Sequence, residues 1–175
     1  MLKQLAKISI NLTMKYCKTR KRLLFVFSLF TSLTVFSQTD TSIVKFKNPS
    51  SVATPKGYSH AAVIDLVNCQ MVVLSGQVPF DNNGNIVGKG DFSKQTEQVF
   101  LNIKNIISEL GGTMDNIIKI GIYMVDMSQI QTFRDVRNKF INIKNPPAST
   151  LVQVSKLFRD DVLLEVEVTA IIPKK

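Results

Sequence analysis

The chain has 175 residues, with 22 Lys and Arg against 13 Asp and Glu, two cysteines and one histidine. So few histidines and cysteines exclude the usual zinc site built from nitrogen and sulfur ligands. Residues 1–37 hold seven of the basic residues and no acidic one, which leaves 15 basic against 13 acidic residues, a net charge of +2. We therefore expect no nucleic-acid partner, because such partners are bound through clustered Lys and Arg.

The first 37 residues have the pattern of a cleaved secretory signal peptide. A basic run at 18–22 precedes mostly apolar residues at 23–36, and polar residues begin at Ser37. A membrane anchor needs roughly 20 apolar residues, so an uncleaved anchor is the weaker alternative. We expect an exported protein, periplasmic or secreted, without a stable membrane anchor, and translation from Met14 is an alternative start. Cleavage would leave Cys69 as the only cysteine, which excludes an intrachain disulfide.

The segments after the signal predict a strand-rich first half. Residues 38–51 form a polar leader, and one short strand is possible at 42–46. Two runs with strand character, at 60–66 and 70–74, flank a hairpin connection at 67–69. The loop at 81–85 is rich in Asn and Gly, which is typical of turns.

The second half alternates helices and strands. Apolar residues at helical spacing predict a helix that begins at Asp91 or Ser93 and ends at Gly111-Gly112. A strand at 116–125, a helix at 128–142 and final strands at 149–155 and 162–172 follow. The fold class is therefore α+β, one domain at 52–175 with a mixed sheet and two helices on one face.

Polar side chains on the last strands are the candidates for chemistry. Glu165, Glu167 and Thr169 alternate with apolar residues, so they share one face of their strand. Such a face is more often simply solvated than a catalytic carboxylate pair. Ser149 and Leu151 share a face of the strand expected beside it. A Ser/His triad is not indicated, since no Gly-x-Ser-x-Gly motif occurs.

Two further positions have both a functional and a plain structural interpretation. Gly76 would let a ligand approach the backbone closely, or it would only turn the chain. Tyr58 would cover a small ligand at the mouth of a strand, or it would be an ordinary tyrosine at the edge of the core.

Taken in order, these fragments resemble the Rid (YjgF, RidA-like) family, also called endoribonuclease L-PSP, over about residues 52–173. The resemblance implies a chorismate-mutase-like fold, a homotrimer, and small-molecule clefts between subunits. It also implies cofactor-independent hydrolysis of reactive enamines and imines to carbonyl compounds and ammonia. The fragments are Tyr58-Ser59-His60-Ala61, Leu74-Ser75-Gly76-Gln77-Val78-Pro79, Gln95, Asn102-Ile103-Lys104, Gly111-Gly112, Asp126-Met127, Pro147-Ala148 and Leu164-Glu165-Val166-Glu167-Val168-Thr169-Ala170.

The resemblance also implies a role for individual residues. Glu165 matches the glutamate that positions the attacking water, and Tyr58 matches the ring that lines the cleft. Gly76 matches the backbone carbonyl near the substrate nitrogen, and the backbone N–H of Leu151 matches a contact to the substrate carboxylate.

One motif departs from the family pattern. Deaminating members have arginine in Pro-Ala-Arg-Ser/Thr, where this chain has Ser149. Serine cannot hold a carboxylate with two parallel hydrogen bonds, so Arg137 or Arg159 would have to replace that arginine. Two functions stay open: an imine or enamine deaminase of altered specificity, or a non-catalytic exported trimer that binds a small metabolite or a protein partner. A ribonuclease is the least supported.

Overall fold

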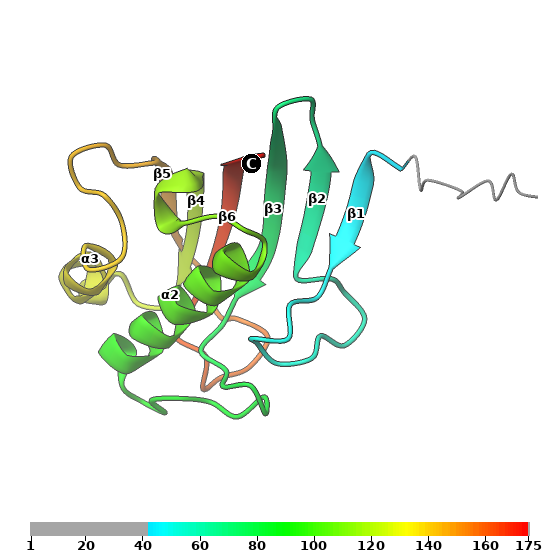
Figure 1. The fold of residues 1–175 in the computed structure, drawn as a ribbon. Coiled ribbons are helices and arrows are strands. Elements are labelled where there is room, and N and C mark those ends of the chain that lie inside the picture. Colours follow the sequence, from blue (N-terminus) through cyan, green and yellow to red (C-terminus); the bar gives the residue numbers. More distant parts are fainter. Residues whose placement is uncertain (1–41, 175) are drawn as a thin grey trace, which may run out of the picture. The chain divides into compact units, whose positions relative to one another are not determined.

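The computed structural model of the chain describes residues 42–174 (Figure 1). The signal peptide predicted at 1–37 lies outside these residues. Within residues 42–174, no helix is long and apolar enough to cross a membrane.

A six-stranded mixed sheet forms the framework, with the strand order β1-β2-β3-β6-β4-β5. Every neighbouring pair is antiparallel except β4 and β5, which run parallel. The predicted mixed sheet is confirmed. The strands are β1 Val44–Lys47, β2 Ala61–Asp65, β3 Cys69–Gln77, β4 Ile117–Met124, β5 Ala148–Gln153 and β6 Leu164–Pro173.

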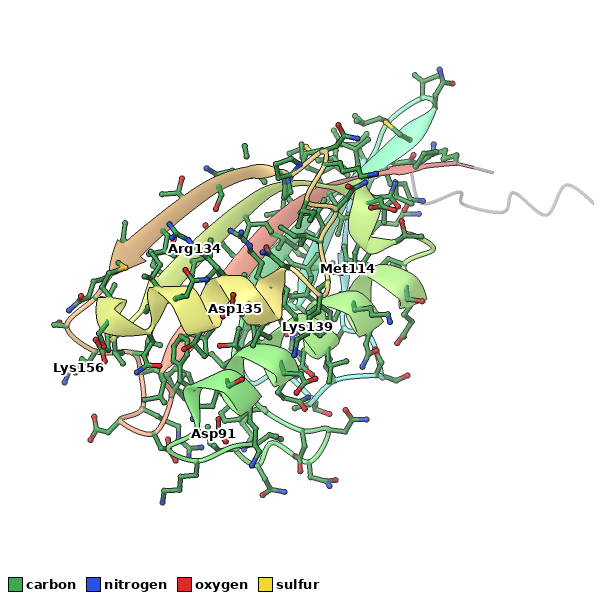
Figure 2. The ribbon with its side chains drawn as sticks, turned by 90° about the vertical axis from the view of Figure 1, so that its left-hand side faces the viewer. Asp91, Met114, Arg134, Asp135, Lys139 and Lys156 are labelled. Atoms are coloured by element: carbon green, nitrogen blue, oxygen red, sulfur yellow. The ribbon has the colours of Figure 1, made fainter. Side chains whose placement is uncertain are left out.

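Two helices, α2 (Phe92–Glu109) and α3 (Ile130–Arg137), lie on one face of this sheet (Figure 1). The side chain of Asp91 caps α2 by accepting a hydrogen bond from the Lys94 backbone N–H, as the sequence predicted. Gly111 follows the helix with φ of +87°, a conformation that favours glycine after a helix end. Figure 2 shows Asp91 at the start of α2, and Arg134 and Asp135 on α3. Short 3-10 turns occur at Met114–Asn116 and Met127–Gln129.

The hydrophobic core fills the space between the helices and the sheet. Val99, Ile103 and Ile107 on α2 are fully buried, as their helical spacing predicts. Phe100 joins the two helices, because its ring lies 6.0 Å from that of Phe133 and 5.4 Å from that of Phe140. The core therefore covers one face of the sheet, and no helix of the described chain covers the other.

Three expectations about the elements were wrong in detail. The helix predicted at 128–142 is helical only at 130–137, because Asp126 accepts hydrogen bonds from Ser128 and starts a 3-10 turn instead. The strand predicted to end at Leu74 continues to Gln77. The strands β5 and β6 are not neighbours, since β4 lies between them.

Candidate functional site

The open face of β6 holds the two glutamates that the sequence placed together. Leu164, Val166 and Val168 are buried against the helices. Glu165 and Glu167 point to the other face, as the alternation of a strand requires. The expectation that the two glutamates share a face is confirmed.

Each glutamate lies directly over a glycine of a neighbouring strand. A Cβ atom added to Gly76 of β3 would overlap the Glu165 carboxylate. A Cβ atom added to Gly121 of β4 would lie 2.6 Å from Glu167 Oε1, which is also too close. Gly76 is thus not a simple turn residue, since its missing side chain makes the space that the Glu165 carboxylate occupies.

A bulge in β3 brings Gly76 under Glu165. Leu74 pairs with Val168, but the next recorded pair is Gln77 with Val166, so β3 has one residue more than β6 over this stretch. An extra residue of this kind bends a strand and redirects its side chains. The bulge therefore sets the close approach between the two strands at the site.

Buried hydrogen bonds hold the segment that carries Tyr58. His60 is buried, and its Nε2 lies 2.7 Å from the carbonyl oxygen of Ala53. A carbonyl only accepts, so Nε2 carries the proton and Nδ1 accepts from Gln77 Nε2 at 3.4 Å. The Tyr58 ring contacts the His60 ring edge-on at 5.4 Å. His60 is therefore a structural residue that positions Tyr58 and the bulged strand.

The two carboxylates have different surroundings. Glu167 Oε1 accepts a hydrogen bond from the Tyr123 hydroxyl at 3.2 Å. The Glu165 carboxylate accepts no hydrogen bond from any residue within 42–174. Burial, and then the charge of Glu167, raise the pKa of Glu165 above its ordinary value of 4.5. Glu165 is thus a carboxylate with free oxygens and increased basicity.

The charge of Glu165 also acts on the nearby phenol. The pKa of Tyr58 is raised above 10.0 by burial and then by the negative charge of Glu165. The phenol of Tyr58 is therefore neutral near pH 7 and available as a hydrogen-bond donor.

A cavity of about 800 Å³ opens beside Glu165. It brings together Tyr58, Gly76 and Glu165, three of the predicted site residues. Its volume is in the range of small-molecule sites. The sequence analysis did not identify the other residues that line the cavity. The only sequence signal for them was the turn-like composition of the loop at 81–85. The missed residues include Val78, Phe80, Asn82, Asn83 and Phe158.

Ser149 and Leu151 lie away from this cavity within one chain. They pair with Ile120 and Ile122 of β4, whose side chains are buried on the helix side of the sheet. Since β4 separates β5 from β6, neither residue reaches Glu165 of its own chain. Their predicted role in a cleft between subunits stays a prediction.

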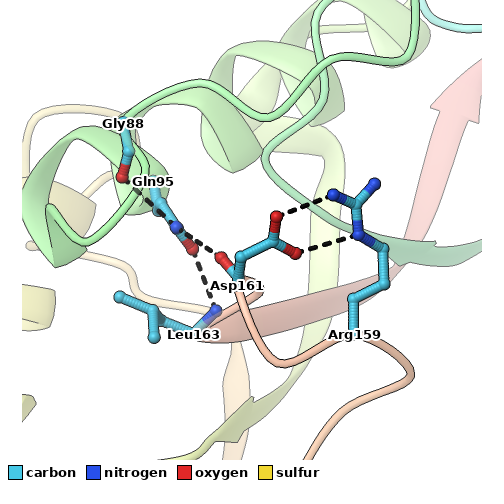
Figure 3. Close-up of polar contacts among 5 residues, drawn as sticks. All are labelled: Gly88, Gln95, Arg159, Asp161 and Leu163. Atoms are coloured by element: carbon cyan, nitrogen blue, oxygen red, sulfur yellow. Dashed lines mark hydrogen bonds and ion pairs between the residues drawn. The ribbon is translucent and has the colours of Figure 1, made fainter.

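Of the two arginines proposed to replace the motif arginine, only Arg159 lines the cavity. Its Nε and Nη2 atoms donate to the Asp161 carboxylate at 2.9 and 2.7 Å (Figure 3). The guanidinium carbon lies 5.4 Å from the centre of the Phe80 ring. Arg137 instead contacts Phe133 on α3 and donates to Asn138.

Gln95 connects α2 to the segment that leads into β6. Its buried amide donates to the carbonyl oxygens of Asp161 at 2.8 Å and Gly88 at 3.2 Å (Figure 3). Its oxygen accepts from the Leu163 backbone N–H at 2.9 Å. Since Leu163 is two residues before Glu165, Gln95 helps to position the start of β6.

No cluster of three metal-ligating side chains occurs in residues 42–174.

Comparisons with known proteins give a family match and solved structures of the same fold. The family model described as Endoribonuclease L-PSP matches residues 49–172. The yeast protein MMF1, mitochondrial, from Saccharomyces cerevisiae, is 32% identical over 122 residues, which cover 70% of this chain and 81% of the relative.

Solved structures share the fold. YyfA from Yersinia pestis, described as a protein of unknown function of the conserved Rid family, superposes with a TM-score of 0.65 at 28% identity, over 73% of this chain and 98% of YyfA. Escherichia coli TdcF with bound serine gives a TM-score of 0.61 at 26% identity, over 74% of this chain and 98% of TdcF. The matched segment, the sequence identity and the shared fold together show that the chain belongs to the endoribonuclease L-PSP family, the Rid (YjgF) family that its motifs resemble.

Proposed function

We propose that this protein hydrolyses small reactive imines or enamines to carbonyl compounds and ammonia, with Glu165 as the catalytic base. The observation that carries the proposal is the Glu165 carboxylate, which faces the cavity with free oxygens and a raised pKa. A base with a pKa closer to neutrality is a better catalyst of proton transfer at physiological pH. Tyr58 and Gly76 line the same cavity and would contact the substrate.

The reaction needs only water, because an imine carbon is already electrophilic. Glu165 takes a proton from water while the water oxygen bonds to the imine carbon, and the electrons of the C=N double bond move to nitrogen. Glu165 passes the proton to that nitrogen. In the second half, Glu165 moves the hydroxyl proton to nitrogen, the C–N bond breaks, and a carbonyl compound and ammonia leave. Each turnover consumes one water.

The proposed assembly is a homotrimer, with clefts between subunits. The open sheet face supports this, since it exposes Phe46 and Val152, with 70% and 41% of their surfaces accessible. Exposed apolar faces of this kind favour burial against another chain. The strand β5 is at an edge of the sheet, so a neighbouring chain's Ser149 and Leu151 could line the cavity. We also propose that the domain acts outside the cytoplasm, after cleavage of residues 1–37.

Two observations bear on the ligand. TdcF, which has this fold, was solved with bound serine, which supports an amino-acid-sized ligand for this family member too. Ser149 in place of the motif arginine favours the alternative of a trimer that binds a small metabolite without turning it over. A ribonuclease is less well supported, because the chain after residue 37 has a net charge of only +2 and its single histidine is buried.

The test is the rate at which the purified domain consumes imines. Imines of several amino acids, generated in solution by an amino-acid oxidase, are followed with and without the protein, and the carbonyl product and ammonia are quantified. We expect faster imine loss with equal yields of the two products, and a loss of that effect in Glu165→Gln. Binding of ligands without any turnover would instead establish the non-catalytic alternative.

A further inference from the structure

Two positively charged side chains line the cavity without contacting the Glu165 carboxylate. These are Lys56 and Arg159. Neither forms an ion pair with Glu165, although all three residues line one cavity. Glu165 also keeps a raised pKa, which a cation in close contact would lower. The cationic groups are therefore separated from the reacting end of the cavity.

Two contacts hold the Arg159 guanidinium in a fixed orientation. Asp161 binds its Nε and Nη2 atoms, and the guanidinium lies over the Phe80 ring (Figure 3). The Nη1 nitrogen is not used by Asp161, so its two N–H groups are free to donate. A pre-oriented guanidinium loses little conformational entropy when it forms one more hydrogen bond.

Apolar side chains line the same cavity as the charged groups. Phe80 and Phe158 contact each other edge-on with ring centres 6.1 Å apart, and Val78 lines the cavity beside them. Phe158 is a large exposed apolar side chain, which a ligand in the cavity would cover. A ligand in the cavity that reaches both Glu165 and Arg159 would therefore have apolar groups to contact as well as charged ones.

We propose that Arg159 binds a carboxylate located at the far end of the substrate, separated from the imine carbon by an apolar segment. The substrate class is an imine or enamine with such a distal carboxylate. Arg159 is then a specificity residue for the proposed hydrolysis, and this inference rests on that function for the chemistry at Glu165. A monoanion suits the site, because Asp161 already neutralises part of the arginine's charge.

The first experiment measures equilibrium binding and needs no turnover. Isothermal titration calorimetry compares 3-phenylpropanoate with 3-phenylpropanamide, which has the same shape and no charge. We expect the wild type to prefer the carboxylate. In Arg159→Met we expect that preference to fall about tenfold to a hundredfold, as for the loss of one hydrogen bond to a charged group. An unchanged preference would overturn the proposal.

Asp161→Asn separates binding from a structural role of the ion pair. If Arg159 binds the ligand, Asp161→Asn frees donor groups and raises the preference for the carboxylate, the opposite of Arg159→Met. If the ion pair only stabilises the loop, the two substitutions change the preference in the same way: both lower it, or neither does. Both substitutions then also lower the thermal midpoint by the same amount. A preference that falls in both variants, or in neither, contradicts the proposal.

The second experiment uses the reaction. Imines generated from L-glutamate and L-norvaline have the same chain length and differ in the distal carboxylate. We expect the ratio of their kcat/KM values to favour the glutamate imine, and Arg159→Met to reduce that ratio through KM. Turnover with a ratio that Arg159 does not affect would leave the hydrolase intact and reject the distal site. Carboxylate binding that depends on Arg159, without any turnover, would support the distal site and reject the hydrolase.

Discussion

The two faces of the sheet differ in how well they tolerate small changes in their side chains. On the helix side, Val99, Ile103 and Val166 are buried among other apolar groups, and exchange of one aliphatic side chain for another of like size would change little. On the open side, Glu165 and Glu167 each lie over a glycine, and a single added methyl group would move a carboxylate. The helix side stabilises the fold, and the open side carries the geometry on which the proposed chemistry depends.

This contrast explains why the open side is the more sensitive to small changes. When a core side chain changes slightly, its many neighbours relax partly around the change, and this reduces the cost in stability. A catalytic carboxylate has one productive position, and an error of about 1 Å can reduce the rate about a hundredfold. The following substitutions test whether stability and activity separate in this way.

Phe100→Ala tests the helix side and has the largest expected effect. Phe100 is fully buried between Phe133 and Phe140, so its truncation should cost about 3–5 kcal/mol of unfolding free energy. Phe158→Ala is the control, because Phe158 is 64% exposed and should cost less than about 0.5 kcal/mol. Urea unfolding measures both, and equal costs would show that the core does not lie where the structure places it.

Gly76→Ala tests the open side. The new methyl group would displace the Glu165 carboxylate, and we expect kcat to fall about a hundredfold or more. Gly121→Ala is the matched control, because it is also on the open face and displaces Glu167 instead. A similar loss in both variants, measured with folded protein, would mean that the rate depends on the face as a whole rather than on Glu165.

Gln95→Ala tests the connection between the two sides. The substitution leaves partly buried backbone groups of Asp161 and Leu163 without their side-chain partner, at a cost of about 1–3 kcal/mol. We expect both the unfolding free energy and kcat to fall. Gln131→Ala, which removes an exposed amide on α3, should change neither. If Gln95→Ala lowers only stability, the amide does not position the site.

The smallest effect expected among the activity tests is a shift in the pH dependence of kcat/KM. Glu165 must be ionised to act as a base, so activity falls as the pH drops through its pKa. Because that pKa is raised above 4.5 by burial and by Glu167, the acid limb lies at higher pH than for an exposed glutamate. Glu167→Gln removes the second cause and should move the acid limb to lower pH. A shift to higher pH would contradict the assigned cause.

The ionisation of Glu165 also predicts a stability effect with a definite sign. A carboxyl group whose pKa is higher in the folded state than in the unfolded chain favours folding at low pH. That contribution is lost as the pH rises through the folded-state pKa. Glu165→Gln should therefore raise the thermal midpoint at pH 7 and have little effect at pH 4, as measured by thermal unfolding. A lower midpoint at pH 7 would mean that the charged form stabilises the fold.

Much of the fold followed from local signals in the sequence. The apolar spacing, the Asp91 cap and Gly111 located α2, because these signals act within a few residues. The alternation around Glu165 and Glu167 correctly gave the faces of β6. The end of α3 was missed, since apolar Phe140 and Ile141 pack on the core without being helical and so extend the helical pattern.

The site was less predictable, because it depends on contacts between distant segments. The position of β4 between β5 and β6 depends on the order of the strands in the sheet, and local residue patterns do not indicate that order. The bulge at Gly76 depends on pairing with a strand about 90 residues away in sequence. Motif order brought Tyr58, Gly76 and Glu165 together, whereas the choice of Arg159 over Arg137 required the cavity itself.

The central claim is that Glu165, and not its neighbour Glu167, is the base of an imine hydrolase. The most direct measurement compares kcat for imine hydrolysis in Glu165→Gln and Glu167→Gln, with folding of both variants checked by circular dichroism. We predict a loss of about 10²- to 10⁴-fold for Glu165→Gln, as for removal of a general base, and less than about a tenfold loss for Glu167→Gln. Equal rates in the two variants, or a larger loss for Glu167→Gln, would contradict the account.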